Sequence, residues 1–272
     1  MNSLIKALKA EIIKNKNSNI TWITFAAFAL APVMGGIFML ILRDSNDLAK
    51  TSTLSAKMEF MNVAANWDSY LNILSQAVGV GGIIVFGFIA AWIFGREYSE
   101  NTIKDLLALP ISMAKISNAK FIVYIFWTIG LAFFNLLTGL IIGLLLHLPT
   151  SNDFLVSAHL SNYFITAILT ILISMPTAFF AVWQKGYLAP LGFMALTLVF
   201  SQIIAATGYG YYFPWSIPGL YSGAGGEYKL QLDALSYGIL ILTSMAGYFS
   251  TIVYYRFSRK NILPNFKRKR QE

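Results

Sequence analysis

The chain has 272 residues, of which 57% are hydrophobic and only 12% charged, and its mean hydropathy is +0.62. An ordinary soluble domain carries about 25% charged residues, so this composition indicates a polytopic membrane protein. The chain has no cysteine, which excludes disulfide frameworks, cysteine metal sites and thiol nucleophiles.

The N-terminal segment MNSLIKALKAEIIKNKNSN carries lysines but no apolar core with a small-residue cleavage site. We therefore expect a retained cytoplasmic segment and not a signal peptide. After it come six stretches long and apolar enough to cross a membrane, which predict an all-α integral membrane protein with one transmembrane domain over residues 1–272. The predicted spans are 20–42, 71–94, 121–146, 163–183, 187–206 and 235–257. Only QKG joins the fourth and fifth, which requires an antiparallel hairpin.

The basic residues divide unevenly between the two ends of these spans. With the N-terminus in the cytoplasm, 16 Lys and Arg residues lie inside and 4 outside. Loops rich in Lys and Arg stay cytoplasmic, so both termini are predicted to face the cytoplasm. The basic tail, 258–272, is expected to contact anionic lipid headgroups and not nucleic acid.

The two longer outer segments offer less specific signals. The stretch MEFMNVAANWDSYL in the first is compatible with an interfacial helix. The aromatic-rich second, from 209 to 233, reads either as an interfacial belt or as a re-entrant element at the mouth of a pathway. His147 and His159 lie near outer span ends and read as interfacial polar residues, with ligation or proton sensing as the alternative.

Several chemistries have no candidate residues in this sequence. It contains no GxxxxGK[ST], HExxH or GxSxG pattern, and GAGG at 223–226 reads as a flexible loop. The span interiors hold essentially no ionisable residues, which disfavours a proton- or ion-coupled transporter. Gln76, Asn135, Ser174 and Gln202 are expected to pack helices together. A transporter of this kind needs energy from a partner protein.

The segment 95–120 is the polar exception between spans two and three. Arg96 is expected to reach lipid headgroups, and Lys115 and Lys120 to mark the inner boundary of span three. Ser99 or Asn101 is a candidate N-cap for a short helix in which Ile103, Leu106 and Leu107 form one apolar stripe. Pro110 ends that helix. The sequence thus predicts a short amphipathic cytoplasmic helix that rests on lipid or presents a face to a soluble partner.

FGREYSENTIKDLLALPISMAKISNAK resembles the first cytoplasmic loop of ABC-2-type permeases, in which F-x-x-E-x-x-x-x-T-x-K-x-L-L-x-x-P precedes basic residues. The six-span layout with both ends inside agrees with that family over nearly the whole chain. The FPWSIP stretch at 213–218 is similar to the bacitracin and lantibiotic immunity permeases.

The resemblance implies that this loop is a coupling helix for a cytosolic ABC ATPase. Its expected coupling residues are Phe94, Arg96, Glu97, Thr102, Ile103, Lys104, Leu106, Leu107, Pro110 and Lys115. It also implies two ATPase copies, a second permease chain of the same or a related kind, and surrounding membrane lipids. This chain itself is expected to bind no cofactor and no metal and to be non-catalytic, with ATP and Mg²⁺ held by the partner.

The resemblance therefore predicts a multi-pass permease subunit, in a bacterial cell membrane, of an exporter for a hydrophobic or amphipathic peptide antibiotic. The alternatives are export of another substrate, such as an ion, drug, lipid or polysaccharide, or a non-transporting membrane sensor or assembly protein. A plain connector loop that caps two spans with charges is the simplest competing interpretation of 95–120.

Overall fold

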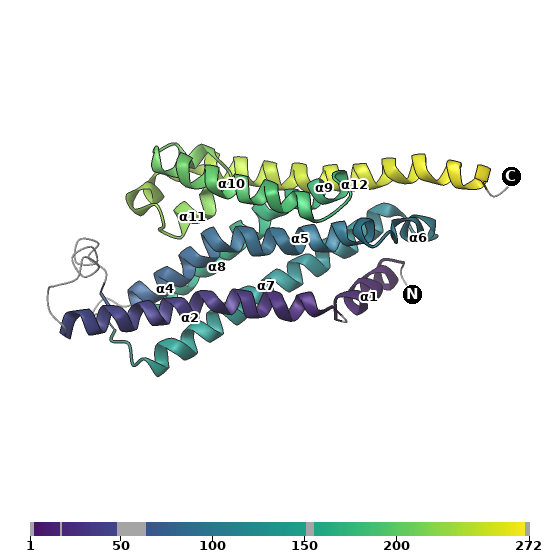
Figure 1. Ribbon diagram of the computed structural model, residues 1–272. Helices are drawn as coiled ribbons and strands as arrows, with labels where there is room; N and C mark the ends of the chain where they lie inside the picture. Colours follow the sequence, from purple (N-terminus) through teal and green to yellow (C-terminus); the bar gives the residue numbers. More distant parts are fainter. Residues whose placement is uncertain (1–2, 17, 48–63, 151–154, 270–272) are drawn as a thin grey trace.

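The computed structural model describes residues 3–16, 18–47, 64–150 and 155–269, and these contain helices and turns without a β-strand. A short helix, α1 (Ser3–Lys16), precedes the long α2 (Asn19–Asp47), and the chain ends in the long α12 (Ala234–Lys269) (Figure 1). The remaining elements are α4 (Trp67–Gln76), η1 (Ala77–Gly81), α5 (Gly82–Ser99), α6 (Ile103–Ala108), α7 (Met113–Leu145), α8 (Val156–Ser174), α9 (Pro176–Trp183), α10 (Leu188–Ala206), η2 (Gly210–Tyr212), α11 (Ile217–Tyr221) and η3 (Gly226–Gln231).

Six helical stretches in the described residues are long and apolar enough to cross a membrane, which confirms the predicted all-α membrane fold. They cover Asn19–Arg43, Trp67–Ser99, Met113–Leu145, Val156–Trp183, Leu188–Ala206 and Ala234–Ser258. The fourth is the most deeply placed, with 67% of its most apolar window buried, and the fifth the most peripheral, with 22%.

Two helices continue beyond the apolar stretches that predicted them. Helix α7 begins at Met113, because Ser112 at its N-cap accepts a hydrogen bond from the Lys115 amide. Lys115 and Lys120 therefore lie inside a helix. Helix α12 runs on into the predicted basic tail as far as Lys269.

Pro32 lies inside α2 without ending it. Proline has no amide hydrogen, so the Phe28 carbonyl four residues earlier loses its helical donor. Asn135 of α7 donates to that carbonyl at 2.9 Å, and Tyr163 of α8 donates to the Asn135 side-chain oxygen at 3.0 Å. The expectation that Asn135 packs helices together is confirmed, and its partner is a backbone group that the bilayer would leave unsatisfied.

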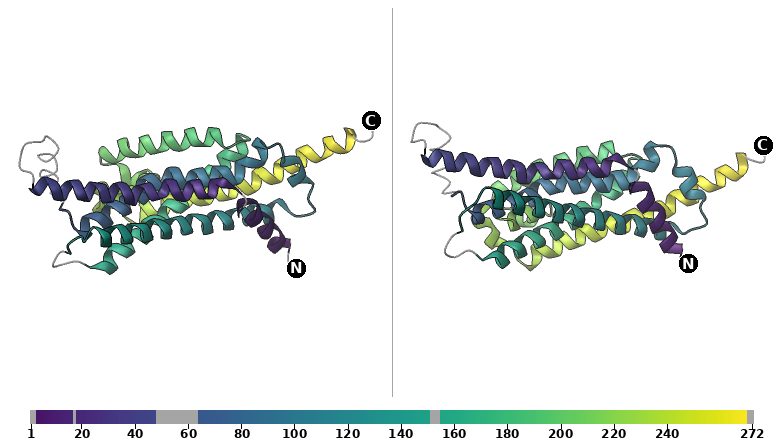
Figure 2. Two further views of the ribbon diagram at one scale, coloured as in Figure 1. Left: turned by 60° about the horizontal axis from the view of Figure 1, so that its bottom comes forward. Right: turned by 90° about the horizontal axis from the view of Figure 1, so that it is seen from below.

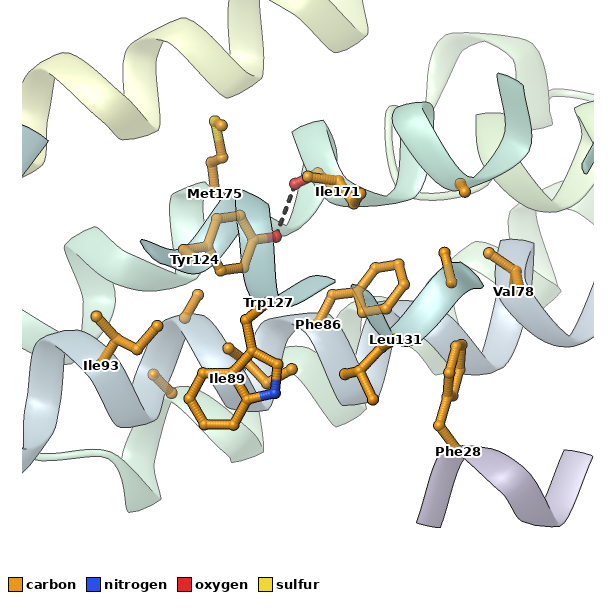
Figure 3. Close-up of a cluster of buried hydrophobic side chains, with 14 of the residues drawn as sticks. Phe28, Val78, Phe86, Ile89, Ile93, Tyr124, Trp127, Leu131, Ile171 and Met175 are labelled. Atoms are coloured by element: carbon orange, nitrogen blue, oxygen red, sulfur yellow. Dashed lines mark hydrogen bonds between the residues drawn. The ribbon is translucent and has the colours of Figure 1, made fainter. Parts of the chain in front are cut away.

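The apolar core lies where α5, α7 and α8 pack together, with α2 against them. Figure 3 shows Phe28, Phe86, Trp127 and Leu131 among its buried side chains. The buried Tyr124 hydroxyl donates to the Ile171 carbonyl at 2.8 Å, which ties α7 to α8.

One outer segment folds back into the bundle. Helix α11 is buried over Ile217–Leu220 and packs on α8 and on the π-helical turn η1. The approach is close, because a Cβ on Gly79 of η1 would come within 2.7 Å of the Pro218 carbonyl oxygen. Of the two interpretations of the aromatic outer segment, the structure favours the re-entrant one. The possible interfacial helix, residues 58–71, lies outside the described residues as far as 63, and its last residues, from Trp67, belong to α4 at the start of the second membrane-spanning stretch.

Both ends of the described chain lie at the same end of the bundle, as Figures 1 and 2 show from three directions. Helices α1 and α6 lie at that end too, and α11 lies at the other. We call the end that carries α1 and α6 the terminal end.

A buried ion-pair cluster beside helix α6

Five charged side chains and one amide meet at the terminal end of the bundle and form what we call the ion-pair cluster. They come from three elements: α1 supplies Glu11, Lys14 and Asn15, α5 supplies Arg96 and Glu97, and α7 supplies Lys120.

Lys120 is the centre of the cluster. Its side chain is 0% exposed, and its ammonium donates to the Glu97 carboxylate at 2.6 Å, to the Ile93 carbonyl at 2.7 Å and to Glu11 at 3.4 Å. It also lies 5.8 Å from the centre of the Phe94 ring. A buried ammonium is tolerated only when its hydrogen-bond donors are paired in this way.

Arg96 binds α1 to α5. Its guanidinium donates to Asn15 at 3.2 Å and to Glu11 at 3.3 Å, and it is 5% exposed. The expectation that Arg96 reaches lipid headgroups is therefore wrong, because two polar side chains of α1 offer it partners inside the protein. Lys120, expected at the inner boundary of span three, lies in the first turns of α7 and is completely buried.

The geometry of α1 explains how it can supply these partners. Ala7, Glu11 and Asn15 recur every four residues and form the buried face of the helix. The Asn15 amide donates to the Glu11 carbonyl at 3.0 Å, which orients its oxygen toward Arg96. Lys14 lies near the edge and contacts both Glu11, at 3.3 Å, and Glu97, at 3.2 Å.

The cluster contains two carboxylates and three cations, so each acid has more than one basic neighbour. Pairing of this kind offsets the cost of removing the charges from water, whereas loss of a single partner leaves a buried charge uncompensated. Beyond their charges, the contacts fix α1, α5 and α7 to one another, so we expect the three helices to move together.

The residues predicted from the sequence for ATPase coupling separate into two groups. Buried side chains are Phe94, Arg96, Glu97, Leu106 and Leu107, with Ile103 half-buried; exposed ones are Thr102, Lys104, Pro110 and Lys115. The Phe94 ring packs on Phe121 with ring centres 4.6 Å apart, and the Phe94 carbonyl accepts a hydrogen bond from the Tyr255 hydroxyl at 3.3 Å. It therefore joins α5 to α7 and α12.

Helix α6 exists where the sequence predicts a short helix, but its apolar stripe faces inward. Leu106 and Leu107 belong to the hydrophobic core, and Ile103 packs against it. The N-cap is Thr102, without a side-chain hydrogen bond, and not Ser99 or Asn101, because α5 continues through Ser99 and Asn101 adopts a left-handed φ of 58°. The face left at the surface carries Lys104, Asp105 and Ala108.

Sequence reasoning found Glu97 and Lys120 but missed Glu11, Lys14 and Asn15. Glu11 is the one acidic residue in the lysine-rich N-terminal segment, and Asn15 follows it at helical spacing. A single acidic residue among lysines was the feature of the sequence that could have indicated a buried partner for Arg96 and Lys120.

At the end of the bundle opposite the terminal end, the two histidines have different surroundings. His159 lies 2.9 Å from the Asp68 carboxylate, joining α8 to α4, and the His147 ring is 3.1 Å from the Leu145 carbonyl. Within the described residues, no group of three or more His, Cys, Asp or Glu residues is placed to hold a metal ion.

Comparison with known proteins adds two findings. Residues 7–203 match the model of a family described as ABC-2 family transporter protein. Over 179 residues the chain is 25% identical to a bacitracin transport permease protein of Bacillus licheniformis, an alignment that covers 64% of this chain and 84% of that protein.

Proposed function

The chain belongs to the ABC-2 transporter family, and we propose that it serves as the permease subunit of an ATP-driven exporter that carries an amphipathic or hydrophobic peptide antibiotic out of the membrane. The observation that carries the proposal is the family match over residues 7–203, which includes most of α1, all of α6 and the whole ion-pair cluster. The choice of substrate rests on the relative from Bacillus licheniformis, whose name states bacitracin transport.

In this proposal ATP is hydrolysed by a separate cytosolic subunit. Permeases of this family are normally non-catalytic, and the sequence has no GxxxxGK[ST] pattern with which to hold a nucleotide. ATP and Mg²⁺ therefore belong to the partner, present in two copies beside a second permease chain.

The surface proposed to meet the ATPase is the exposed face of α6. Its inward stripe is already occupied by the core, and Lys104, Asp105 and Ala108 are exposed on the opposite side. Motion imposed on α6 would pass to α5, which it contacts, and through Glu97 to α1 and α7.

Substitutions on this exposed face test the docking surface. We expect Lys104→Glu and Ala108→Arg to reduce co-purification of the co-expressed ATPase by about tenfold or more and to abolish the stimulation of ATP turnover. Lys185→Glu is the matched control, since Lys185 is an exposed lysine in the turn between α9 and α10. Leu107→Asp is unsuitable, because Leu107 is completely buried and its loss would disturb the fold itself. Normal ATPase binding and turnover in both α6 variants would contradict this surface.

The substrate is tested separately. Cells that express the chain together with its ATPase should tolerate more bacitracin or lantibiotic than cells that express either subunit alone, measured as the minimal inhibitory concentration. Unchanged sensitivity to bacitracin and to every lantibiotic tested would contradict a peptide antibiotic as the substrate. Binding without any change in ATP turnover would instead support a sensor or assembly protein.

A further inference from the structure

Helix α1 buries polar side chains and leaves apolar ones at the surface. Glu11 and Asn15 are buried in the ion-pair cluster, whereas Ile5 and Ile12 are 45% and 49% exposed. An amphipathic helix that covers a soluble core has the reverse distribution, with its apolar side chains inward. The exposed isoleucines therefore indicate that a second apolar surface lies against α1.

The isoleucines share one side of the helix, which we call the isoleucine side. Ile5, Leu8 and Ile12 follow one another at spacings of three and four residues, the spacing of neighbours on a helix surface. Leu8 is half-buried and packs against the hydrophobic core. The isoleucine side is thus a continuous apolar strip that begins at the protein and extends outward from it.

The opposite side of α1 faces the terminal end of the bundle. Ser3, Ala10 and Lys14 share this side, at spacings of seven and four residues. Ser3 accepts a hydrogen bond at 2.7 Å from Lys115, which lies in the first turn of α7, before Lys120. Lys14 lines a cavity of about 590 Å³ that α6 also borders. Because this side points toward the start of α7 and toward α6, the isoleucine side points toward the membrane-spanning stretches.

Helix α1 also has the position and direction of a helix at a bilayer surface. It ends at Lys16, and the first membrane-spanning stretch begins at Asn19. Figure 2 shows α1 at a steep angle to α2. When α2 crosses the bilayer, α1 therefore runs across the headgroup region. An apolar side turned toward the spans then meets the boundary between headgroups and acyl chains, where amphipathic helices bury such residues.

The exposed charges of α1 are all positive. Lys6, Lys9 and Lys16 are exposed, and the one acidic residue of the helix, Glu11, is buried. Lys9 precedes Ile12 by three residues and Lys16 follows it by four, so both lysines border the isoleucine side. Lysine can keep its apolar stem against an apolar surface while its ammonium reaches a phosphate. Lysines at this level are attracted to anionic lipids.

We propose that the isoleucine side of α1 binds the anionic lipid surface of the leaflet at the terminal end. Ile5 and Ile12 lie at the boundary of the acyl chains, and Lys9 and Lys16 contact lipid phosphates. Because the ion-pair cluster fixes α1 to α5 and α7, this contact holds the cluster at the level of the headgroups. The contact requires only that the chain spans a membrane, so it does not depend on the transport proposal.

The test measures how closely each side of α1 approaches lipid. The full chain has no cysteine, so a fluorophore can be attached to it at Ile12→Cys or, as the matched control on the opposite side, at Ala10→Cys. Each labelled chain is reconstituted into phosphatidylcholine vesicles with or without phosphatidylglycerol. Nitroxide lipids in both leaflets quench the label whichever way the chain inserts.

We expect the label at position 12 to be quenched severalfold more than the label at position 10 when phosphatidylglycerol is present. Ile5→Cys repeats the measurement at the other isoleucine and should behave like position 12. Equal quenching on the two sides of the helix, or stronger quenching at position 10, would overturn the proposed orientation.

Two double variants of the Ile12→Cys chain test the charge. Lys9→Gln with Lys16→Gln should weaken the phosphatidylglycerol-dependent part of the quenching about fivefold or more. Lys104→Gln with Lys185→Gln removes the same charge from exposed lysines outside α1 and should leave the quenching unchanged. Equal losses in the two double variants, or no effect of phosphatidylglycerol on the chain with all its lysines, would overturn the anionic contact.

The same label distinguishes lipid from a protein partner. Binding of the ATPase should leave the quenching at position 12 unchanged. Loss of that quenching when the ATPase binds would show that the partner covers the isoleucine side and would overturn the lipid contact. Quenching that falls as the amount of chain per lipid rises would assign the surface to a second copy of the chain and would overturn it too.

Discussion

Lys120 shows that a lysine at the predicted boundary of a membrane span can be completely buried inside the protein. It follows the polar segment 95–120 and precedes an apolar stretch, the position of a lysine at a membrane boundary. The structure places it inside because α7 begins seven residues earlier, and because Glu11 and Glu97 approach it from two other helices.

Removing the Lys120 ammonium group should lower the stability of the fold. We expect Lys120→Met to destabilise the chain by about 3–5 kcal/mol, because two buried carboxylates lose their most enclosed partner. Thermal unfolding in detergent measures the change. Lys115→Met is the control: Lys115 is exposed, its one recorded side-chain hydrogen bond is to Ser3, and its loss should shift stability by no more than about 0.5 kcal/mol.

A second variant distinguishes charge from packing. Glu97→Gln combined with Lys120→Met should be less destabilised than the sum of the single variants, with a coupling of about 0.5–3 kcal/mol. Strict additivity, or equal melting of Lys120→Met and Lys115→Met, would contradict a cluster held together by charge.

At the scale of elements, helical periodicity predicted the apolar face of α6 but not what covers that face. Ile103, Leu106 and Leu107 do lie on one side of a helix, yet the groove they fill belongs to the same chain. A hydrophobic stripe has the same pattern whether it meets a partner or the core. The distinction depends on α5 and α12, which lie beside α6 only after folding.

The turn between α9 and α10 packs directly on α5 at Gly95. A Cβ at Gly95 would lie 2.7 Å from the Gly186 carbonyl and 2.8 Å from the Tyr187 nitrogen, both backbone atoms. Because backbone cannot rotate away as a side chain can, Gly95→Ala should force α5 and α10 apart and cost about 1–3 kcal/mol.

Gly192 provides a control at which substitution by alanine should not destabilise the fold. It lies within α10, and nothing stands within 4 Å of the position its Cβ would take. Gly192→Ala should therefore be neutral or stabilising by up to about 1 kcal/mol, because alanine favours a helix. Similar melting temperatures for the two alanine variants would refute the close approach at Gly95.

For the whole molecule, six spans could be predicted because the thickness of a bilayer sets a length that composition reveals directly. The ion-pair cluster could not, since the bonds that join α1 to α5 and α7 connect residues about 80 to 110 positions apart. The sequence shows that Glu11, Arg96, Glu97 and Lys120 are ionisable, and only the packing of α1 against α5 and α7 brings them together.

The same charge distribution predicts which way the molecule faces. Sixteen of the twenty Lys and Arg residues lie at the terminal end or in the segments assigned to it, so that end should face the cytoplasm. The chain has no cysteine, so single cysteines can be introduced without removing any. Tyr228→Cys, in η3 at the opposite end, should react with a membrane-impermeant maleimide in intact cells. Ser112→Cys, in the loop after α6, should react only after the membrane is opened.

Ser174→Cys serves as the control for both positions, because Ser174 is completely buried within span four and should remain unlabelled in either condition. The reverse pattern, with position 112 labelled in intact cells and position 228 protected, would place α6 outside the cell. A cytosolic ATPase could not then reach it, and the exporter proposal would fail together with the orientation. The expected pattern puts the exposed face of α6, the ion-pair cluster and the cavity beside it on the side of the membrane where ATP is available.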